Sequence, residues 1–484
     1  MTREITDQAH NLLVISDLHL GEDLRPGGAS VSYLVHLEHE LARFLLHHAE
    51  HRRDGRPWRL VVNGDMVDFM SMKILPADAA GASDADDPDD DRVYGLGFSE
   101  RAAQQKMEQV VSRHETVFAA LAEFVKAGHE LVVVVGNHDV EFHYRLVQET
   151  FVERLCALAT PENVAVFTAR ISFCPWFYYE ENRVYIEHGH QFDEYCSFDY
   201  QLHPAPMTQG ELPAAERRNT RSKSRFALSM AHSGMRFFAN QLPEYDPHTA
   251  ESWGFASYFR WAIALGWTGL ARISYLYGLL VWKVVEAWYG MRNADAPRRA
   301  AHLVRMKALS RQWKLTEDKL LALSALHRVP VTRRFFGVLR ALFLDRLLLS
   351  GFGLVAALAL VFAMTGHLRW AAPLLLVAGV VVLNDKLGKL RLASSAERLR
   401  SVPRLLQALV GVPLVVLGHS HAPERVALPN GAEYINTGTW ASADARVAFT
   451  HLVVFATSDD GERVAELRQW RDGESAPFVL PELT

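Results

Sequence analysis

The sequence predicts an α/β fold that is interrupted by a large helical insertion. Short apolar, β-rich runs alternate with helical patterns up to about residue 193, and the same alternation resumes towards the end of the chain. This alternation is typical of a sheet whose strands are buried on both faces. At 484 residues the chain is too long for one ordinary domain, so two or three folded parts are expected.

The expected elements follow from the apolar patterns. In the first part we expect strands at Leu12–Ile15, Leu60–Val62, Leu131–Val135, Val164–Phe167 and Val184–Glu187, with helices at Tyr33–Glu50 and Glu100–Ala127. After the insertion we expect strands at Leu414–Leu417, Glu433–Ile435, Ala448–Phe455 and Arg463–Trp470. The acidic run Gly81–Asp91 is expected to be a solvated loop.

Composition narrows the class of protein. The hydrophobic fraction of 49% allows a sizeable core, and a net charge of −5 with a pI near 6.5 argues against nucleic-acid binding. The three cysteines, Cys156, Cys174 and Cys196, fit no metal or redox spacing and favour a reducing compartment. The polar start of the chain lacks the pattern of a signal peptide, so we expect the catalytic part to face the cytoplasm.

The insertion, from about residue 194 to 410, contains two apolar runs. Leu347–Met364 is uncharged and as long as a spanning helix, whereas Ala371–Leu383 is shorter. Together they predict a transmembrane hairpin at about residues 347–383, and the alternative is a buried helical hairpin in a soluble insertion. The aromatic segment Trp261–Met291 predicts either a buried helix or one that lies at a membrane surface.

Basic residues flank the hairpin on both outer sides. The positive-inside rule therefore places both outer ends in the cytoplasm, with a short external turn near Gly366. The residues before the hairpin are Arg333, Arg334, Arg340 and Arg346, and those after it are Lys386, Lys389, Arg391, Arg398 and Arg400.

Five apolar runs end in Asp, Asn or His. The blocks are "DLH" (Asp17–His19), "NGDMVD" (Asn63–Asp68), "GNHD" (Gly136–Asp139), "EHGHQFD" (Glu187–Asp193) and "GHSH" (Gly418–His421). Ligands of open α/β sheets bind beyond the carboxyl ends of strands, so these side chains are expected on one rim. An extended exit would point Asp17 and His19 to the same side. Glycines at 64, 136, 189 and 418 would let the backbone turn and bring the side chains inward.

This ordered set resembles the calcineurin-like metallophosphoesterase superfamily, whose pattern is DxH, GDxxD, GNH(D/E), a lone His and GHxH. The resemblance implies a layered β-sandwich flanked by helices. It also implies a discontinuous catalytic domain, residues 1–193 and 411–484, around the helical insertion 194–410.

The resemblance further implies a site for two divalent metal ions, Mn²⁺ first, with Fe or Zn²⁺ as alternatives. One ion would be held by Asp17, His19, Asp65 and His421, and the other by Asp65, Asn137, His188 and His419, so that Asp65 bridges them. A hydroxide shared by the ions would attack phosphorus in line.

Other residues of the blocks receive supporting roles. His138 is expected to be a catalytic group rather than a ligand, stabilising the transition state or protonating the leaving oxygen. Asp68 and Asp139 are expected to orient histidine ligands, although Asp68 could equally cap a helix. His190 would lie near the site or face solvent. Asn436 and Thr437 would contact the pocket or merely close a turn.

Within the superfamily, "SDLHLG", "GDMVDF", "GNHD" and the His-Gly motif followed by Phe-Asp are similar to the branch that contains UDP-2,3-diacylglucosamine hydrolases. That branch has Arg at the position of His138 and Asp at that of His190. The resemblance implies a hydrolase of phosphoesters or pyrophosphates at the inner, cytoplasmic membrane, with a lipid-linked substrate as the finer hypothesis. The alternatives are a tethered phosphodiesterase for soluble nucleotides and a non-catalytic, metal-binding membrane scaffold.

Overall fold

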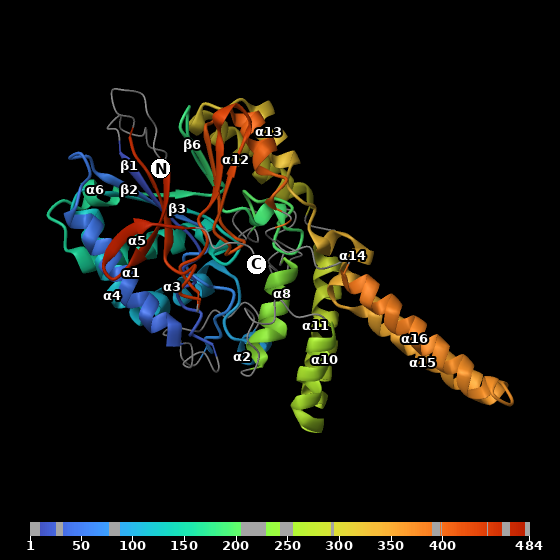
Figure 1. The fold of residues 1–484 in the computed structure, drawn as a ribbon. Helices are drawn as coiled ribbons and strands as arrows, with labels where there is room; N and C mark the ends of the chain where they lie inside the picture. Colours follow the sequence, from blue (N-terminus) through green and yellow to red (C-terminus); the bar gives the residue numbers. More distant parts are fainter. Residues whose placement is uncertain are drawn as a thin grey trace.

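Two β-sheets and the helices that cover them form the body of the molecule (Figure 1). The computed structural model describes residues 10–25, 32–76, 88–204, 229–242, 255–291, 295–389, 397, 399–442, 444–456 and 465–479. The N-terminal segment up to residue 9, most of the acidic run 81–91 and most of the basic segment 203–225 lie outside the described residues, as do Arg391 and Arg398.

The first sheet has the strand order β12-β11-β10-β1-β2-β3-β4. Strands β1 to β4 run parallel, and β10 joins β1 in antiparallel register. The strands are β1 (Asn11–Ile15), β2 (Trp58–Asn63), β3 (Glu130–Val134), β4 (Ile171–Cys174), β10 (Thr450–Val454), β11 (Ala465–Arg471) and β12 (Glu474–Pro477).

The second sheet has the order β5-β6-β7-β9-β8. Its three central strands are parallel, and the outer strands β5 and β8 are antiparallel to their neighbours. Because β7 pairs with β6, the chain returns after the insertion to the strand that it left. The strands are β5 (Phe177–Glu180), β6 (Val184–Glu187), β7 (Leu414–Leu417), β8 (Glu424–Ala427) and β9 (Glu433–Asn436).

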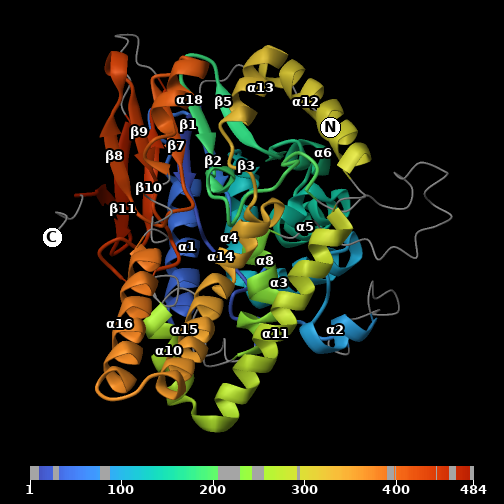
Figure 2. The same cartoon turned by 90° about the vertical axis from the view of Figure 1, so that its right-hand side faces the viewer.

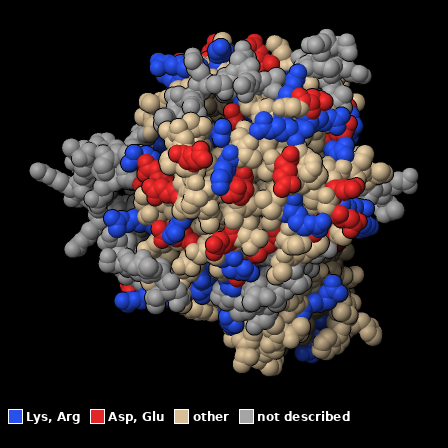
Figure 3. Space-filling model, turned by 90° about the vertical axis from the view of Figure 1, so that its left-hand side faces the viewer, with Lys and Arg blue, Asp and Glu red and all other residues tan. Residues whose placement is uncertain are grey.

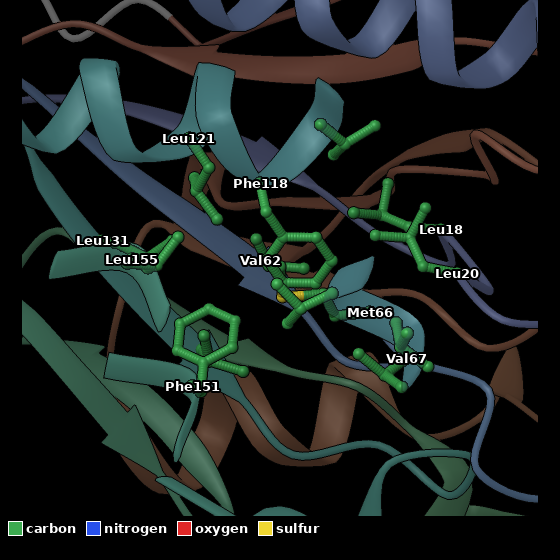
Figure 4. Packing of buried hydrophobic residues seen from close by; sticks show 14 of the residues in the cluster. Leu18, Leu20, Val62, Met66, Val67, Phe118, Leu121, Leu131, Phe151 and Leu155 are labelled. Carbon is green, nitrogen blue, oxygen red and sulfur yellow. The ribbon is translucent and has the colours of Figure 1, made fainter. Parts of the chain in front are cut away.

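Alternation along β1 divides the core into two layers. Leu13 and Ile15 pack against the helices of one face, whereas Leu12 and Val14 pack against the second sheet. Figure 4 shows part of the helical layer, where Phe118 and Phe151 lie over the first sheet. The helices of this layer are α1 (Ser32–Glu50), α3 (Glu100–Arg113), α4 (Glu115–Lys126) and α5 (Arg145–Ala159).

Helices of the insertion complete the body. Trp313 of α12 (Asp295–Trp313) and Leu320 of α13 (Glu317–Ala325) belong to the buried cluster of the second sheet, as does Leu406 of α18 (Pro403–Val410). The arrangement is therefore helices, sheet, sheet, helices, and it confirms the expected layered β-sandwich flanked by helices.

A third buried cluster joins other insertion helices below the sheets. Phe237 of α8 (Met230–Phe237), Leu280 and Val284 of α11 (Gly266–Met291), and Val338 of α14 (Phe335–Ala341) pack together there. The remaining elements are α2 (Pro88–Tyr94), α6 (Val164–Thr168), α10 (Phe255–Ala264) and the 3-10 helices η3 (Val140–His143), η4 (His190–Phe192), η5 (Ala239–Gln241), η6 (Val331–Arg333) and η7 (Pro429–Gly431).

Two helices project from the body as a hairpin, α15 (Leu344–Ala363) and α16 (Leu368–Lys389) (Figures 1 and 2). Both are long and apolar enough to cross a membrane. Only 17% of the apolar window of α15 and 6% of that of α16 is buried, so they are not core helices. The alternative of a hairpin buried in the body does not fit this low burial. The face of the body in Figure 3, by contrast, mixes acidic and basic side chains.

Two element predictions are wrong, and a third is wrong in part. Residues 88–91 of the acidic run, expected to be a solvated loop, begin the helix α2, and Asp91 is buried and accepts from Arg236. The expected strand Val164–Phe167 is the helix α6, because Asn163 caps its first turn by accepting the Val166 amide, and the strand β4 follows it instead. The expected helix Glu100–Ala127 is two helices that meet at His114. The ring of His114 accepts the Gly21 amide at 2.9 Å and contacts Glu38, which ties the break to the loop after β1.

Candidate metal centre

The loops at the carboxyl ends of parallel strands gather the predicted ligands on one rim. Three clusters of side chains each offer ligand atoms within 4.8 Å of one another. They are Asp17, His19 and His421; His19, Asp65 and His138; and Asp65, His188 and His419. Asn137 joins the third cluster, because its Oδ1 lies 3.2 Å from His188 Nε2. All seven predicted ligands therefore lie together, and Asp65 belongs to two of the clusters.

The backbone of the ligand loops is strained. Five of the seven predicted ligands, a subset of the non-glycine residues with positive φ, adopt left-handed conformations: Asp17, His19, Asp65, His419 and His421, with φ between 49° and 65°. Non-glycine residues rarely adopt this region, and such strain clusters at functional sites. The exit of β1 is therefore not extended. Asp17 and His19 converge through two left-handed turns. They do lie close together, as predicted, but the extended strand exit on which that prediction depended is not present.

The glycines act in two different ways. Gly64 and Gly189 have positive φ and allow tight turns. Gly64 also leaves space, because a Cβ there would overlap the ring of His188, and Gly136 and Gly418 act by leaving space alone. A Cβ on Gly136 would overlap Asp65 Oδ1, and one on Gly418 would overlap the Ser16 hydroxyl and contact Asp17. These two glycines let the ligand-bearing loops approach the carboxylates closely.

The first cluster brings acceptor atoms face to face. Asp17 Oδ1 lies 3.2 Å from His421 Nε2, and His421 Nε2 lies 3.3 Å from His19 Nε2. Asp17 and His19 are fully buried, whereas His421 is about a quarter exposed. Two imidazole nitrogens at this distance repel each other unless a proton or a metal ion lies between their lone pairs.

The third cluster fixes the tautomer of the neutral His188 ring. Its Nδ1 lies 2.8 Å from the Asn63 carbonyl, to which it can only donate, so Nε2 of the neutral ring carries the lone pair. That Nε2 lies 3.1 Å from Asp65 Oδ2 and 3.2 Å from Asn137 Oδ1. Oxygen atoms of Asp65 and Asn137 thus converge on Nε2 of His188. The contact of Nδ1 with the Asn63 carbonyl is of the kind that orients metal-bound histidines.

The pKa shifts of the ligand residues also indicate that the clusters favour a positive charge between them. Burial alone would raise the pKa of Asp65, but the neighbouring His188 and His138 outweigh it and lower that pKa well below its usual value. Burial opposes a charged His188, yet Asp65 and Asp17 raise its pKa to about 9. Burial lowers the pKa of His19. Ionised carboxylates and neutral imidazoles are the forms that bind metals, so a divalent ion at His188 would take the place of the proton that Asp65 and Asp17 favour there.

His138 is held at the edge of the cluster. Its Nδ1 lies 2.8 Å from Asp68 Oδ1, its backbone amide donates to Asp65 Oδ1 at 2.8 Å, and its side chain is 19% exposed. Asp68 Oδ2 lies 3.5 Å from His19 Nδ1. Asp68 therefore contacts both histidines, as the orienting role requires. It also accepts the Ser71 amide, but Ser71 lies in a turn and not in a helix, so Asp68 is not a helix cap.

Asp139 does not orient a histidine, contrary to the prediction. Its two oxygens accept the Gly136 amide at 2.6 Å and the Met66 amide at 2.8 Å, and they fix the loops that bear Asn137 and Asp65. Asn436 likewise holds a loop, donating to the Gly418 carbonyl at 2.8 Å.

The ring of His190 is buried, with its centroid 5.5 Å from that of His188, so it lies near the site rather than in solvent. Thr437 is buried, and its carbonyl accepts the Thr450 hydroxyl, which links the loop after β9 to the start of β10.

The sequence argument missed Asp193 and Cys196. Asp193 Oδ2 lies 3.5 Å from His419 Nε2, and the two residues form a further cluster with Cys196. A carboxylate beside the outer nitrogen of a ligating histidine fixes its ring orientation. Asp193 was visible in the block "EHGHQFD", but nothing local shows that a histidine more than 200 residues later would meet it.

The comparison with protein families agrees with this geometry. The family described as calcineurin-like phosphoesterase matches residues 10–283, more than half of the chain. The chain belongs to the calcineurin-like phosphoesterase family. The match includes four of the five ligand blocks and ends within α11, before the block Gly418–His421. No curated protein and no solved structure matches the chain.

Proposed function

We propose that this calcineurin-like phosphoesterase is a membrane-associated hydrolase that uses two divalent metal ions to cleave a P–O bond of a lipid-linked phosphoester or pyrophosphate. Membership of the family gives the reaction class. The proposal adds that two cations are bound, that the protein is associated with a membrane and that its substrate is linked to a lipid. It also places the body at the cytoplasmic face of the inner membrane.

The observation that carries the proposal is the convergence of acceptors at His188 and at His421. His188 Nε2 meets Asp65 and Asn137 within 3.2 Å, and His421 Nε2 meets Asp17 and His19 within 3.3 Å. Two points that each need a cation, with Asp65 shared between clusters, match a dinuclear centre better than a single ion. Mn²⁺ is the first choice for such a mixed nitrogen and oxygen set, with Fe and Zn²⁺ as alternatives.

Different residues of the chain have different roles in the proposed reaction. The ions, when bound, supply an activated water and neutralise phosphoryl charge. His138 keeps its Nδ1 on Asp68, which leaves Nε2 directed away from that carboxylate to donate a proton to the leaving oxygen. Asp193 orients His419, and the Asn63 carbonyl orients His188. Each supporting contact keeps a ligand in place before substrate binds.

The lipid-linked substrate is supported by the link between the rim and the projecting helices. Asn240, just after α8, donates to the Met70 carbonyl at 3.0 Å, in the loop that follows Asp68. Lys73 in the same loop lies 2.5 Å from Gln241, whose carbonyl accepts from Arg272 of α11. The loop that carries Asp65 and Asp68 therefore rests on helices that lead to the apolar hairpin.

Hydrolysis of bis-p-nitrophenyl phosphate by the purified full-length protein with Mn²⁺ tests the reaction. Activity that falls to background in Asp65→Ala and strongly in His138→Ala would support the proposal. Equal rates for the wild type and Asp65→Ala would contradict it and favour a non-catalytic scaffold.

The substrate class needs a separate comparison. UDP-diacylglucosamine in detergent micelles and water-soluble nucleotides are assayed side by side. The proposal expects faster turnover of the lipid and a dependence on detergent. Faster turnover of soluble nucleotides without that dependence would overturn the lipid assignment and leave a tethered phosphodiesterase.

A further inference from the structure

A second apolar hairpin, formed by α10 and α11, projects from the same side of the body as α15 and α16. In Figure 2 both pairs of helices extend downwards from the body and end in a turn, and Figure 1 shows that α15 and α16 also lean away from α10 and α11. The turn of the second hairpin lies at Gly266, which has a φ of +71°. No charged residue occurs from Trp261 to Ala271, and Arg260 and Arg272 bound this stretch. We call residues 261–271 the apolar tip.

The apolar tip exposes large side chains that a protein in water would bury. Trp267 is 88% exposed and Ile263 is 54% exposed. Further along α11, Tyr275 is 70% exposed and Trp282 is 66% exposed. Trp and Tyr are enriched where a membrane meets water, because each ring has an apolar body and a polar edge.

The base of the second hairpin is fixed to the body. Leu280 and Val284 are buried against α8 and α14, and Lys283 Nζ lies 2.6 Å from Asp90. Arg272 donates to the Gln241 carbonyl at 2.5 Å. The tip therefore projects from a supported helix.

The base also joins the two hairpins. The Tyr277 hydroxyl donates to the carbonyl of Leu342, which lies between α14 and α15. The second hairpin is thus joined to the segment of chain that enters the first hairpin. A bilayer that surrounds α15 and α16 lies on the side to which the apolar tip points.

The length of the apolar tip indicates how deep it reaches. From Gly266 to Arg272 an α-helix rises about 9 Å. Amphipathic elements that lie in the membrane interface bury their apolar parts by roughly 5–10 Å. Arg260 and Arg272 would then lie at the level of the lipid phosphates, with Trp267 and Ile263 below them.

We propose that the apolar tip inserts into the leaflet nearest the body, as a shallow second anchor beside the spanning hairpin. The occupant of its exposed surface is lipid. This inference rests on the proposed membrane association, and it adds that the catalytic body is held at two points, so that its rim keeps one orientation to the membrane.

Fluorescence quenching by lipids tests the second anchor. The full-length protein, with Cys156 and Cys196 replaced by Ser and the buried Cys174 retained, receives a single NBD label and is reconstituted into phosphatidylcholine–phosphatidylglycerol vesicles. The labelled variants are Trp267→Cys and Ile263→Cys at the tip, Leu358→Cys in the middle of α15, and Arg145→Cys on the exposed surface of α5. The vesicles carry lipids with a nitroxide either near the glycerol or at mid-chain.

The expected result separates the two anchors. Nitroxide near the glycerol should roughly halve the emission of both tip variants, as a shallow insertion requires, and iodide in the buffer should not quench them. Mid-chain nitroxide should quench Leu358→Cys, and Arg145→Cys should respond to iodide alone.

Each contrary result has one meaning. Tip labels that respond to iodide and not to lipid, while Leu358→Cys is quenched by lipid, would overturn the second anchor and leave the spanning hairpin intact. Tip labels that respond to neither quencher would indicate a protein contact, such as a second copy of the chain, and would also overturn it. Lipid quenching at none of the sites would overturn the membrane association itself.

Discussion

The metal-ligand rim and the projecting helices differ in the kind of side chain that each buries or exposes. At the rim, charged and polar side chains such as Asp17, Asp65 and His188 are fully buried and face one another. On α15, apolar side chains face outward, and Phe362 is 82% exposed. A buried charge is costly unless it is paired or binds a metal, and an exposed apolar helix is costly unless lipid covers it. Each region is therefore incomplete in water alone, and each points to the partner that completes it.

The largest effect on catalysis short of losing the metals is expected from His138→Gln. Loss of a proton donor lowers kcat by about 10²–10⁴-fold. Because we propose that His138 acts as a proton donor and not as a ligand, the metal content should stay unchanged. Steady-state rates with bis-p-nitrophenyl phosphate and metal analysis check both parts, with the exposed His51→Gln as the matched control. A variant that also loses its metal would show that His138 belongs among the ligands.

The next effect concerns the lipid side of the comparison. We propose that α15 spans a membrane, and Arg in the middle of a spanning helix costs about 2.5–3.5 kcal/mol on insertion scales, so Val355→Arg should release protein from carbonate-washed membranes. Val93→Arg, at a similarly exposed valine of the body, should change nothing. Equal membrane retention of both variants would mean that α15 does not contact lipid.

A smaller effect is expected at the support of the rim. Asp68→Asn keeps the size of the side chain but weakens its contacts with His138 and His19, so metal affinity or activity should fall by about 10–100-fold. Asp472→Asn, at an exposed aspartate, is the control. Titration with Mn²⁺ and measurement of kcat separate the two effects. If Mn²⁺ affinity and kcat both stay unchanged in Asp68→Asn, Asp68 does not support the metal site.

The smallest effect concerns stability and pH. Burial lowers the pKa of His48 and of His451 to about 3, below the ordinary 6.5. The unfolded chain therefore binds protons first as pH falls below 6.5, and the folded state loses about 2 kcal/mol per histidine at pH 5. This loss continues down to the folded pKa.

Thermal unfolding at pH 7 and pH 5 checks this sign. His48→Gln should lose less stability than the wild type over that interval, whereas the exposed His51→Gln should behave as the wild type. An equal loss in His48→Gln and wild type would place the acid sensitivity in other groups.

The sequence was informative where the signal is local. Each ligand block follows its strand within a few residues, so the strands β1, β2, β3, β6 and β7 and the shared rim could be predicted. The exposed hairpin could also be predicted, because an uncharged run of that length has few alternatives.

Contacts between distant residues could not be read in this way. The pairing of Asp193 with His419 depends on how β6 and β7 align across the insertion. The left-handed turns at Asp17 and His19 are set by the loop that meets them, since the amides of Leu18 and His19 both donate to the Asp65 carbonyl. The packing of α12 and α13 on the second sheet has no local signal either.

The central claim is that Asp65 lies between two cations, and metal stoichiometry with electron paramagnetic resonance tests it most directly. The full-length protein is loaded with Mn²⁺, washed free of excess metal and compared with Asp65→Asn. We predict two Mn²⁺ per chain and the multiline spectrum of a coupled pair for the wild type, and loss of that coupling in the variant. One Mn²⁺ per chain, or a coupled spectrum that survives in Asp65→Asn, would contradict the account.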